Sequence, residues 1–67
     1  MLFKNQLAVN PTKQITSEHL RTADKLVRLK RYQEALVELE TAQSLDPQDL
    51  HTRAFLERTR FMLDMEQ

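Results

Sequence analysis

The chain has 67 residues, so it forms one domain at most and buries only about 60% of the surface that its unfolded form exposes. It contains no cysteine and two histidines, which excludes a disulfide framework and makes a structural zinc site unexpected. Ten lysines and arginines balance ten aspartates and glutamates, so the overall charge offers no attraction to nucleic acid or to an anionic membrane.

The N-terminal segment gives the weakest signal for secondary structure. Its first eleven residues, MLFKNQLAVNP, contain one basic residue and no apolar run long enough for a signal peptide or a membrane span. We therefore expect a cytoplasmic protein with no membrane partner. Residues 1–14 are interpreted either as an N-terminal arm or as a degenerate half-repeat, that is, a weakened copy of the segment that ends at Pro47. The second interpretation rests on Phe3 and Pro11, which align with Leu39 and Pro47.

A first helix is expected over residues 17–29. Its apolar residues recur at steps of three and four, at Leu20, Ala23, Leu26, Val27 and Leu29. Thr16 or Ser17 is predicted to cap its N-terminus, and Ile15 and Leu20 have the spacing of a hydrophobic staple.

A second helix is expected within Arg31–Pro47, RYQEALVELETAQSLDP, and should end before the proline. Its apolar stripe consists of Tyr32, Ala35, Leu36, Leu39, Ala42 and Leu45. Because about two residues separate it from the first helix, the two should form an antiparallel hairpin. The chain has no glycine, so a turn that needs positive φ must place Lys30 or Arg31 there at a cost of about 1 kcal/mol.

A third, long helix is expected from Asp46 to about Met65. Asp46 is predicted as its N-cap, Pro47 as its first residue, and Leu45 with Leu50 as a second hydrophobic staple. One apolar stripe of this helix consists of Phe55, Leu56, Thr59, Met62 and Leu63, and a second stripe beside it consists of Ala54, Phe61 and Met65.

The combined width of these two stripes exceeds what one hairpin can cover. We therefore predict that part of the third helix is buried against another chain, either a second copy in a homo-oligomer or a partner protein. The residues predicted for this interface are Ala54, Phe55, Phe61, Met62 and Met65.

The hairpin resembles a known family. Ala23 three residues before Leu26, Tyr32 opening the second helix, Ala35 three residues later, and the closing Asp46-Pro47 resemble the tetratricopeptide repeat, a helix-turn-helix unit of about 34 residues. The resemblance covers roughly residues 16–48. The chain departs from the family pattern at His19, Thr22 and Lys30, where the family favours Trp, Leu and Gly.

The resemblance implies a concave face formed chiefly by the first helix. Carried over by position, the residues available there for peptide binding are Leu20, Arg21, Asp24, Val27 and Arg28. Arg21 and Arg28 would hold a carboxylate by bidentate hydrogen bonds, and Leu20 and Val27 would supply apolar contact.

No constellation of residues indicates catalysis. The histidines lack a second ligand at metal spacing, no glycine-rich phosphate loop exists, and neighbouring Ser17, Glu18 and His19 point in different directions from a helix. We therefore expect neither an enzyme nor a metal or organic cofactor.

The sequence thus predicts an all-α fold, in which residues 15–67 form a tetratricopeptide-like hairpin followed by a long third helix. The expected function is a protein-protein interaction module that self-associates or docks on a partner through the third helix. One alternative is a peptide-clamping chaperone or adaptor. Another is a small regulatory protein that places its basic face, Arg21 to Arg31, on nucleic acid, which its interspersed acids and lack of aromatics disfavour.

Overall fold

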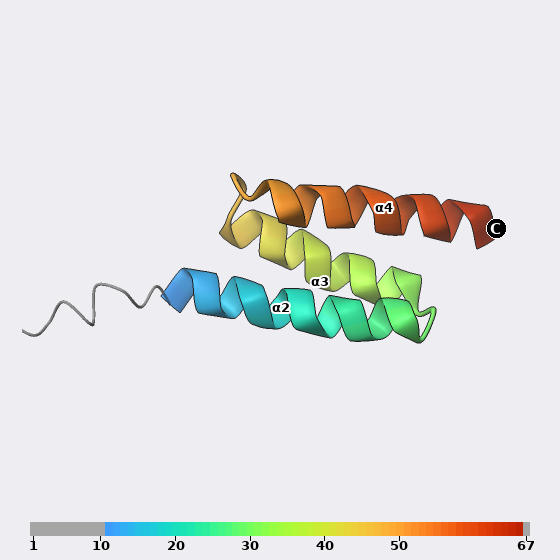
Figure 1. The fold of residues 1–67 in the computed structure, drawn as a ribbon, viewed down its shortest axis with the longest axis horizontal. Coiled ribbons are helices and arrows are strands. Elements are labelled where there is room, and N and C mark those ends of the chain that lie inside the picture. Colours follow the sequence, from blue (N-terminus) through green and yellow to red (C-terminus); the bar gives the residue numbers. More distant parts are fainter. Residues whose placement is uncertain (1–10, 67) are drawn as a thin grey trace, which may run out of the picture.

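The computed structural model describes residues 11–66, which form three helices joined by two short turns. The helices are α2 (Pro11–Arg28), α3 (Tyr32–Leu45) and α4 (Leu50–Glu66). α2 and α3 form an antiparallel hairpin, and α4 packs along α3 while running in the same direction as α2 (Figure 1). The predicted all-α fold, a helical hairpin followed by a third helix, is therefore confirmed.

The first helix begins earlier than predicted. It starts at Pro11, a residue suited to the first turn because no intrahelical partner for its missing N–H is required there. Thr16 therefore lies in the interior of the helical sequence and not at its start. Its side chain is buried, and its hydroxyl donates to the Thr12 carbonyl oxygen at 2.8 Å. The prediction of Thr16 or Ser17 as N-cap, and of the Ile15–Leu20 staple, is therefore wrong.

The predicted N-terminal segment of residues 1–14 divides at this helix start. Residues 11–14 belong to α2. The two interpretations of the remainder, as an arm or as a degenerate half-repeat, fall on residues 1–10 and lie outside the described residues.

The turn between α2 and α3 confirms that a residue other than glycine takes positive φ. Lys30 has a φ of 62°. The Arg31 N–H donates to the Leu26 carbonyl at 2.8 Å, and the Lys30 N–H donates to the Val27 carbonyl at 2.9 Å. These two bonds form a Schellman motif, which satisfies carbonyl groups at the end of α2 and reverses the chain in three residues.

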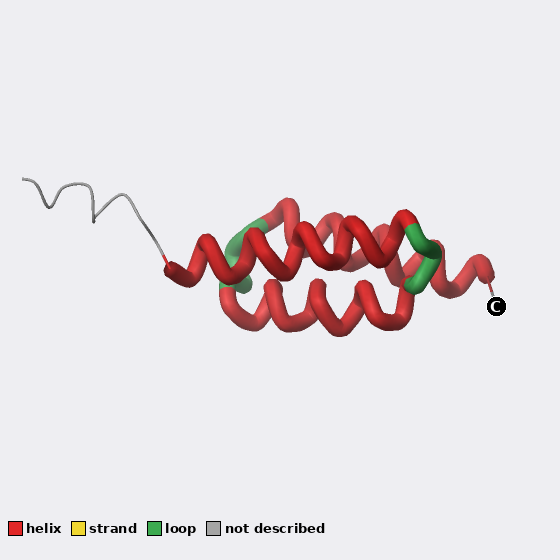
Figure 2. The backbone as a smooth tube through the Cα atoms, turned by 90° about the horizontal axis from the view of Figure 1, so that it is seen from below, coloured by secondary structure: helices red, strands yellow, loops and turns green. Residues whose placement is uncertain are grey.

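The core lies where α3 meets its two neighbours (Figures 1 and 2). Its buried hydrophobic residues are Ala23 from α2, Ala35, Leu39 and Ala42 from α3, and Phe55 and Leu56 from α4. Alanine at the α2–α3 contact has no side chain beyond Cβ, so the two helices can approach closely. A hydrogen bond of 2.7 Å between His19 Nδ1 and Glu38 Oε1 links the same two helices beside this contact.

Replacing Ala35, which is fully buried, with glutamate tests the close approach of α2 and α3. Ala35→Glu should lower the free energy of unfolding by 3 kcal/mol or more, roughly, because the charge has no room and no partner. The matched control is Gln33→Glu, which adds the same charge on the exposed face of α3 and should change stability by less than about 0.5 kcal/mol. Urea unfolding followed by circular dichroism measures both, and equal stability of the two variants would contradict the helix contact.

The positive φ at Lys30 generates a prediction of opposite sign. Lys30→Gly should raise the free energy of unfolding by about 1 kcal/mol, because glycine adopts this conformation without a Cβ clash. Lys30→Ala also removes the amine but keeps the Cβ, so it serves as the control and should not stabilise the protein. A glycine variant less stable than the alanine variant in urea would show that the turn imposes no left-handed strain.

Candidate functional site

The helix α4, which carries the predicted interface, starts three residues later than expected. Asp46, Pro47, Gln48 and Asp49 form a turn closed by a hydrogen bond of 3.1 Å from the Asp49 N–H to the Asp46 carbonyl. Proline is favoured at the second position of such a turn. Pro47 is therefore a turn residue, and the prediction of Asp46 as the N-cap of this helix is wrong.

Asp49 is the residue that caps α4. Its Oδ1 accepts from the His51 backbone N–H at 3.3 Å, and its Oδ2 accepts from the buried Thr52 hydroxyl at 2.7 Å. The Thr52 hydrogen bond is the main reason that the pKa of Asp49 lies below its ordinary value of 3.8, and the hydrogen bond and charge of His51 act in the same direction. With the cap at Asp49, Leu50 cannot form the predicted staple with Leu45, and Leu50 is 71% exposed.

The inner face of α4 rests on the hairpin and fixes the orientation of the helix. Thr52, Phe55, Leu56 and Thr59 are buried there. The Thr59 hydroxyl is satisfied within the helix, because it donates to the Phe55 carbonyl at 2.9 Å. Farther along, Met62 and Leu63 are half-buried. The inner face thus contains all five residues of the first apolar stripe expected from the sequence, together with Thr52, which that stripe did not include.

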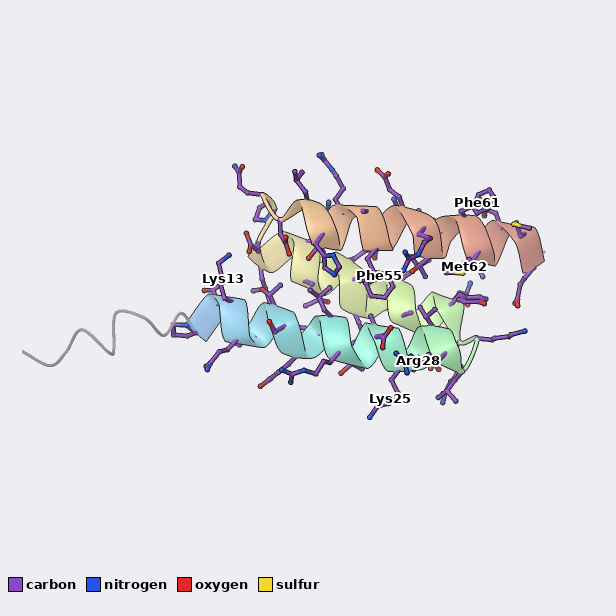
Figure 3. All side chains as sticks on the ribbon, viewed as in Figure 1. Lys13, Lys25, Arg28, Phe55, Phe61 and Met62 are labelled. Carbon is purple, nitrogen blue, oxygen red and sulfur yellow. The ribbon has the colours of Figure 1, made fainter. Side chains whose placement is uncertain are left out.

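The opposite face of α4 carries an exposed apolar row, here called the outer α4 stripe. It consists of Leu50, Ala54, Phe61 and Met65, spaced by four, seven and four residues so that all lie on one side of the helix. The side chains of Phe61 and Met65 are 62% and 70% exposed. Phe61 lies on the edge of the bundle away from α3, whereas Phe55 points toward the neighbouring helices (Figure 3).

The residues predicted for the partner interface do not all lie on one exposed surface. Ala54, Phe61 and Met65 are exposed on the outer α4 stripe, Met62 is half-buried, and Phe55 is in the core. Phe55 is thus committed to contacts within this chain. Leu50 also belongs to the exposed row but was not predicted there. The predicted cap at Asp46 paired Leu50 with Leu45 in a hydrophobic staple. Its spacing of four residues from Ala54 could have placed it on the same side of the helix.

A second surface lies between α2 and α4. It is an open groove of about 360 Å³, lined by Leu20, Arg21 and Asp24 from α2 and by His51, Ala54, Phe55 and Arg58 from α4. The Arg58 guanidinium lies over the Phe55 ring at 5.4 Å from its centroid, and the His51 ring centroid is 6.4 Å from that of Phe55. The groove therefore has an apolar floor with cationic groups at its rim.

The residues predicted for peptide binding do not all meet in this groove. Leu20, Arg21 and Asp24 line it, whereas Val27 packs against the core. Arg28 pairs with Asp24 at 3.1 Å and faces a different hollow, of about 480 Å³, on α2. Sequence analysis missed the contributions of His51 and Arg58, since only the packing of α4 beside α2 brings them to this place.

The hollow on α2 is the part of the predicted basic face that precedes the turn. Arg21, Lys25 and Arg28 line it together with two acids, Glu18 and Asp24. Lys25 and Arg28 lie on the α2 side of the molecule in Figure 3. The acids leave this face with a mixed charge, which reduces the attraction for a phosphate backbone.

Comparison with models of protein families, with curated proteins and with solved structures finds no match to this chain. Within residues 11–66, no helix combines the length and the hydropathy needed to cross a bilayer. The same residues include no group of three or more His, Cys, Asp or Glu side chains arranged to hold a metal ion.

The capping carboxylate of Asp49 gives a pH-dependent prediction. Because folding lowers the pKa of Asp49, the ionised carboxylate stabilises the fold fully above about pH 3.8, the ordinary pKa of the group. This contribution is lost as the pH falls through the lowered pKa. Asp49→Asn keeps a capping oxygen but removes the charge at the helix N-terminus, so it should cost about 1 kcal/mol near neutral pH. Urea unfolding should show this difference shrinking toward zero near pH 2, and a difference independent of pH would contradict the role of the carboxylate.

Proposed function

We propose that this chain is a non-catalytic protein-protein interaction module that self-associates or docks on a partner protein through the outer α4 stripe. The observation that carries the proposal is the row of large apolar side chains left exposed at Leu50, Phe61 and Met65, on a helix whose other face is already buried. Scattered exposed hydrophobic residues are common on proteins, but several large apolar side chains on one helix face are typical of an interaction surface.

We further propose that the α2–α3 hairpin is a tetratricopeptide-type repeat. Support comes from the residues that carried the resemblance: Ala23, Ala35 and Ala42 are fully buried, and the hairpin turns at Lys30. In this interpretation α4 takes the place of the first helix of a following repeat. Because such repeats bury their apolar faces by stacking on neighbours, the outer face of α4 corresponds to a face that a neighbouring helix would cover.

The groove between α2 and α4 supports a second candidate function, the clamping of an acidic peptide. Leu20 and Phe55 would receive an apolar side chain, while Arg21 and Arg58 would bind a carboxylate. We rank this function second because the groove is open and its cations have acidic Asp24 among them. Nucleic-acid binding ranks third, since the hollow on α2 has mixed charge.

Phe61→Asp tests the first proposal. The substitution places a charge within the expected contact and should lower the association constant by at least about tenfold, while the helical circular dichroism of the monomer is retained. Val37→Asp is a matched control, because Val37 is 61% exposed on α3, close to the 62% of Phe61, but lies outside the outer α4 stripe. Sedimentation equilibrium over a range of concentrations gives the mass of each variant.

The salt dependence of the mass separates apolar from ionic association. Contact through Leu50, Phe61 and Met65 should persist or strengthen at high salt, whereas contact through several phosphates or surface ion pairs should weaken. A wild-type protein that stays monomeric at every concentration and salt, indistinguishable from Phe61→Asp, would contradict the proposed self-association. A mass reduced equally by Val37→Asp and Phe61→Asp would contradict the assignment to α4.

A further inference from the structure

We propose that the groove between α2 and α4 binds an amphipathic helix of a partner protein, which carries acidic residues on both sides of its apolar stripe and runs antiparallel to α2 and α4. This inference rests on the second candidate function, the clamping of an acidic peptide, and specifies the conformation and the direction of that peptide. Its basis is the combination in one groove of two arginines that no described carboxylate pairs, an apolar floor, and walls made by two helices that run in the same direction.

Arg21 and Arg58 give the rim of the groove a positive charge, one from each wall. In the part of the chain that the structure describes, three other arginines form ion pairs with carboxylates, whereas these two form none. Asp24, the acid among the described lining residues, is paired with Arg28 at 3.1 Å. The groove therefore keeps two uncompensated cations although the whole chain has no net charge, and we expect its ligand to supply carboxylates.

The Arg58 guanidinium is oriented by an aromatic contact before any ligand binds. It lies over the ring of the buried Phe55, 5.4 Å from the ring centroid. Contact with the face of a ring leaves the N–H groups at the edge of the guanidinium free to donate to a carboxylate, with the two parallel hydrogen bonds that arginine favours. An oriented arginine loses less conformational entropy when it binds, so Arg58 is suited to hold one acidic edge of the ligand.

The walls of the groove favour a helical ligand over an extended one. The backbone N–H and C=O groups of α2 and α4 are engaged in their own helical hydrogen bonds, so these helices offer a ligand only side chains. Among the described residues that line the groove, none has the carboxamide side chain that can pair with a peptide group as both donor and acceptor. An extended ligand would therefore lose backbone hydrogen bonds to water, whereas a helix satisfies these groups internally.

The arrangement of the three helices sets the direction of the ligand. α2 and α4 run in the same direction, and α3, which packs against both, runs in the opposite direction (Figures 1 and 2). A ligand helix parallel to α3 is antiparallel to both walls of the groove, as in an antiparallel four-helix bundle. In this direction the dipoles of the ligand and of its two neighbours are opposed, whereas the reverse direction would align all three.

The floor of the groove sets the apolar pattern of the ligand. It consists of Leu20, Ala54 and Phe55. The lining residues of α4 extend from His51 to Arg58, which is about 10 Å or two turns along the helix axis. The ligand therefore needs apolar side chains at spacings of three and four over two turns. A contact of this size is small, so we expect a dissociation constant on the order of 100 μM.

Three synthetic peptides of about 14 residues test the conformation and charge of the ligand. The first has leucines at helical spacing flanked by glutamates, the second replaces each glutamate with lysine, and the third keeps the glutamates but has prolines in its centre, which prevent a helix. Fluorescence anisotropy of each labelled peptide, titrated with the full chain, gives its dissociation constant. The first peptide should bind at least about tenfold more tightly than either of the others, and it should gain helical circular dichroism on binding.

Charge reversal locates the bound peptide. Arg21 is chosen because it lies on α2, away from the outer α4 stripe. Arg21→Glu should weaken binding of the first peptide about tenfold, because the groove then repels an acidic edge. Arg53→Glu is the matched control, since Arg53 is also exposed but does not line the groove, and it should change the affinity by less than about twofold. Circular dichroism of both variants checks that the helical fold is retained.

Disulfide trapping tests the direction, and the chain suits it because it has no cysteine of its own. His51→Cys places a thiol in the groove near the start of α4. The first peptide is prepared with a cysteine either at its C-terminus or at its N-terminus. In the antiparallel arrangement the C-terminal cysteine lies nearer to residue 51, so under mild oxidation that peptide should cross-link faster by about tenfold. Equal rates, or faster reaction of the N-terminal cysteine, would overturn the proposed direction.

The outcomes separate failure of this inference from failure of the proposed functions. Equal binding of the first and third peptides would overturn the helical ligand and leave the clamping of an acidic peptide standing. Absence of binding by both acidic peptides, or equal binding of the lysine peptide, would contradict the inference together with that second candidate function. Binding that Phe61→Asp abolishes and Arg21→Glu leaves unchanged would place the peptide on the outer α4 stripe, which overturns the inference but supports the first proposed function.

Discussion

The close contact of α2 with α3 is the interaction on which the rest of the structure depends. Ala23 and Ala35 are fully buried where these helices meet, and Leu39 fills the adjacent position with no exposed surface. The pair is locked at one end by the Schellman turn at Lys30 and tied on its flank by the bond between His19 and Glu38. Only a hairpin held in this way presents α4 with a defined surface, because α4 packs chiefly along α3.

α3 packs against both other helices, whereas α2 and α4 each make most of their contacts with α3 and border an open groove between them (Figures 1 and 2). The outer faces of α2 and α4 differ in composition. The hollow on α2 is lined by Arg21, Lys25 and Arg28 together with two acidic residues. Water solvates all of these charged side chains readily. The outer face of α4 instead exposes Phe61 and Met65, whose burial would each contribute roughly 1.5–3 kcal/mol. This asymmetry is the physical basis for assigning interaction to α4.

The parts of the fold that periodicity predicts are those set by burial. Steps of three and four identified α3 to within a residue at each end, and they separated the inner apolar stripe of α4 from the residues beside it. Local hydrogen bonding was harder to predict, because one residue type serves several purposes. Asp46 and Asp49 are both acceptable caps, and Pro47 fits both a helix start and a turn. In the structure Asp49 is the cap, and it accepts a hydrogen bond from the Thr52 hydroxyl.

Part of the candidate site could be predicted from the sequence, and the rest required the structure. Ala54, Phe61 and Met65 could be predicted to share one side of the helix, apart from the buried stripe, because that relation depends on helical geometry alone. The groove could not be predicted in full. Arg21 and Arg58 come from helices separated by the whole of α3, and only the packing of α4 beside α2 brings them to one rim. The start of α2 at Pro11 was likewise missed, because Thr16 resembles an N-cap in sequence but bonds backward to the Thr12 carbonyl within the helix.

The outer α4 stripe and the groove are joined through a shared residue. Ala54 lines the groove and also lies on the stripe, so whatever covers the stripe forms part of the groove's border. A chain that covers the stripe at Ala54 would add a wall to a groove that is open in the single chain. Under the proposed function, association through the stripe and peptide binding in the groove would therefore be coupled, because a peptide that contacts the added chain would bind the complex more tightly than the single chain and stabilise the complex in proportion.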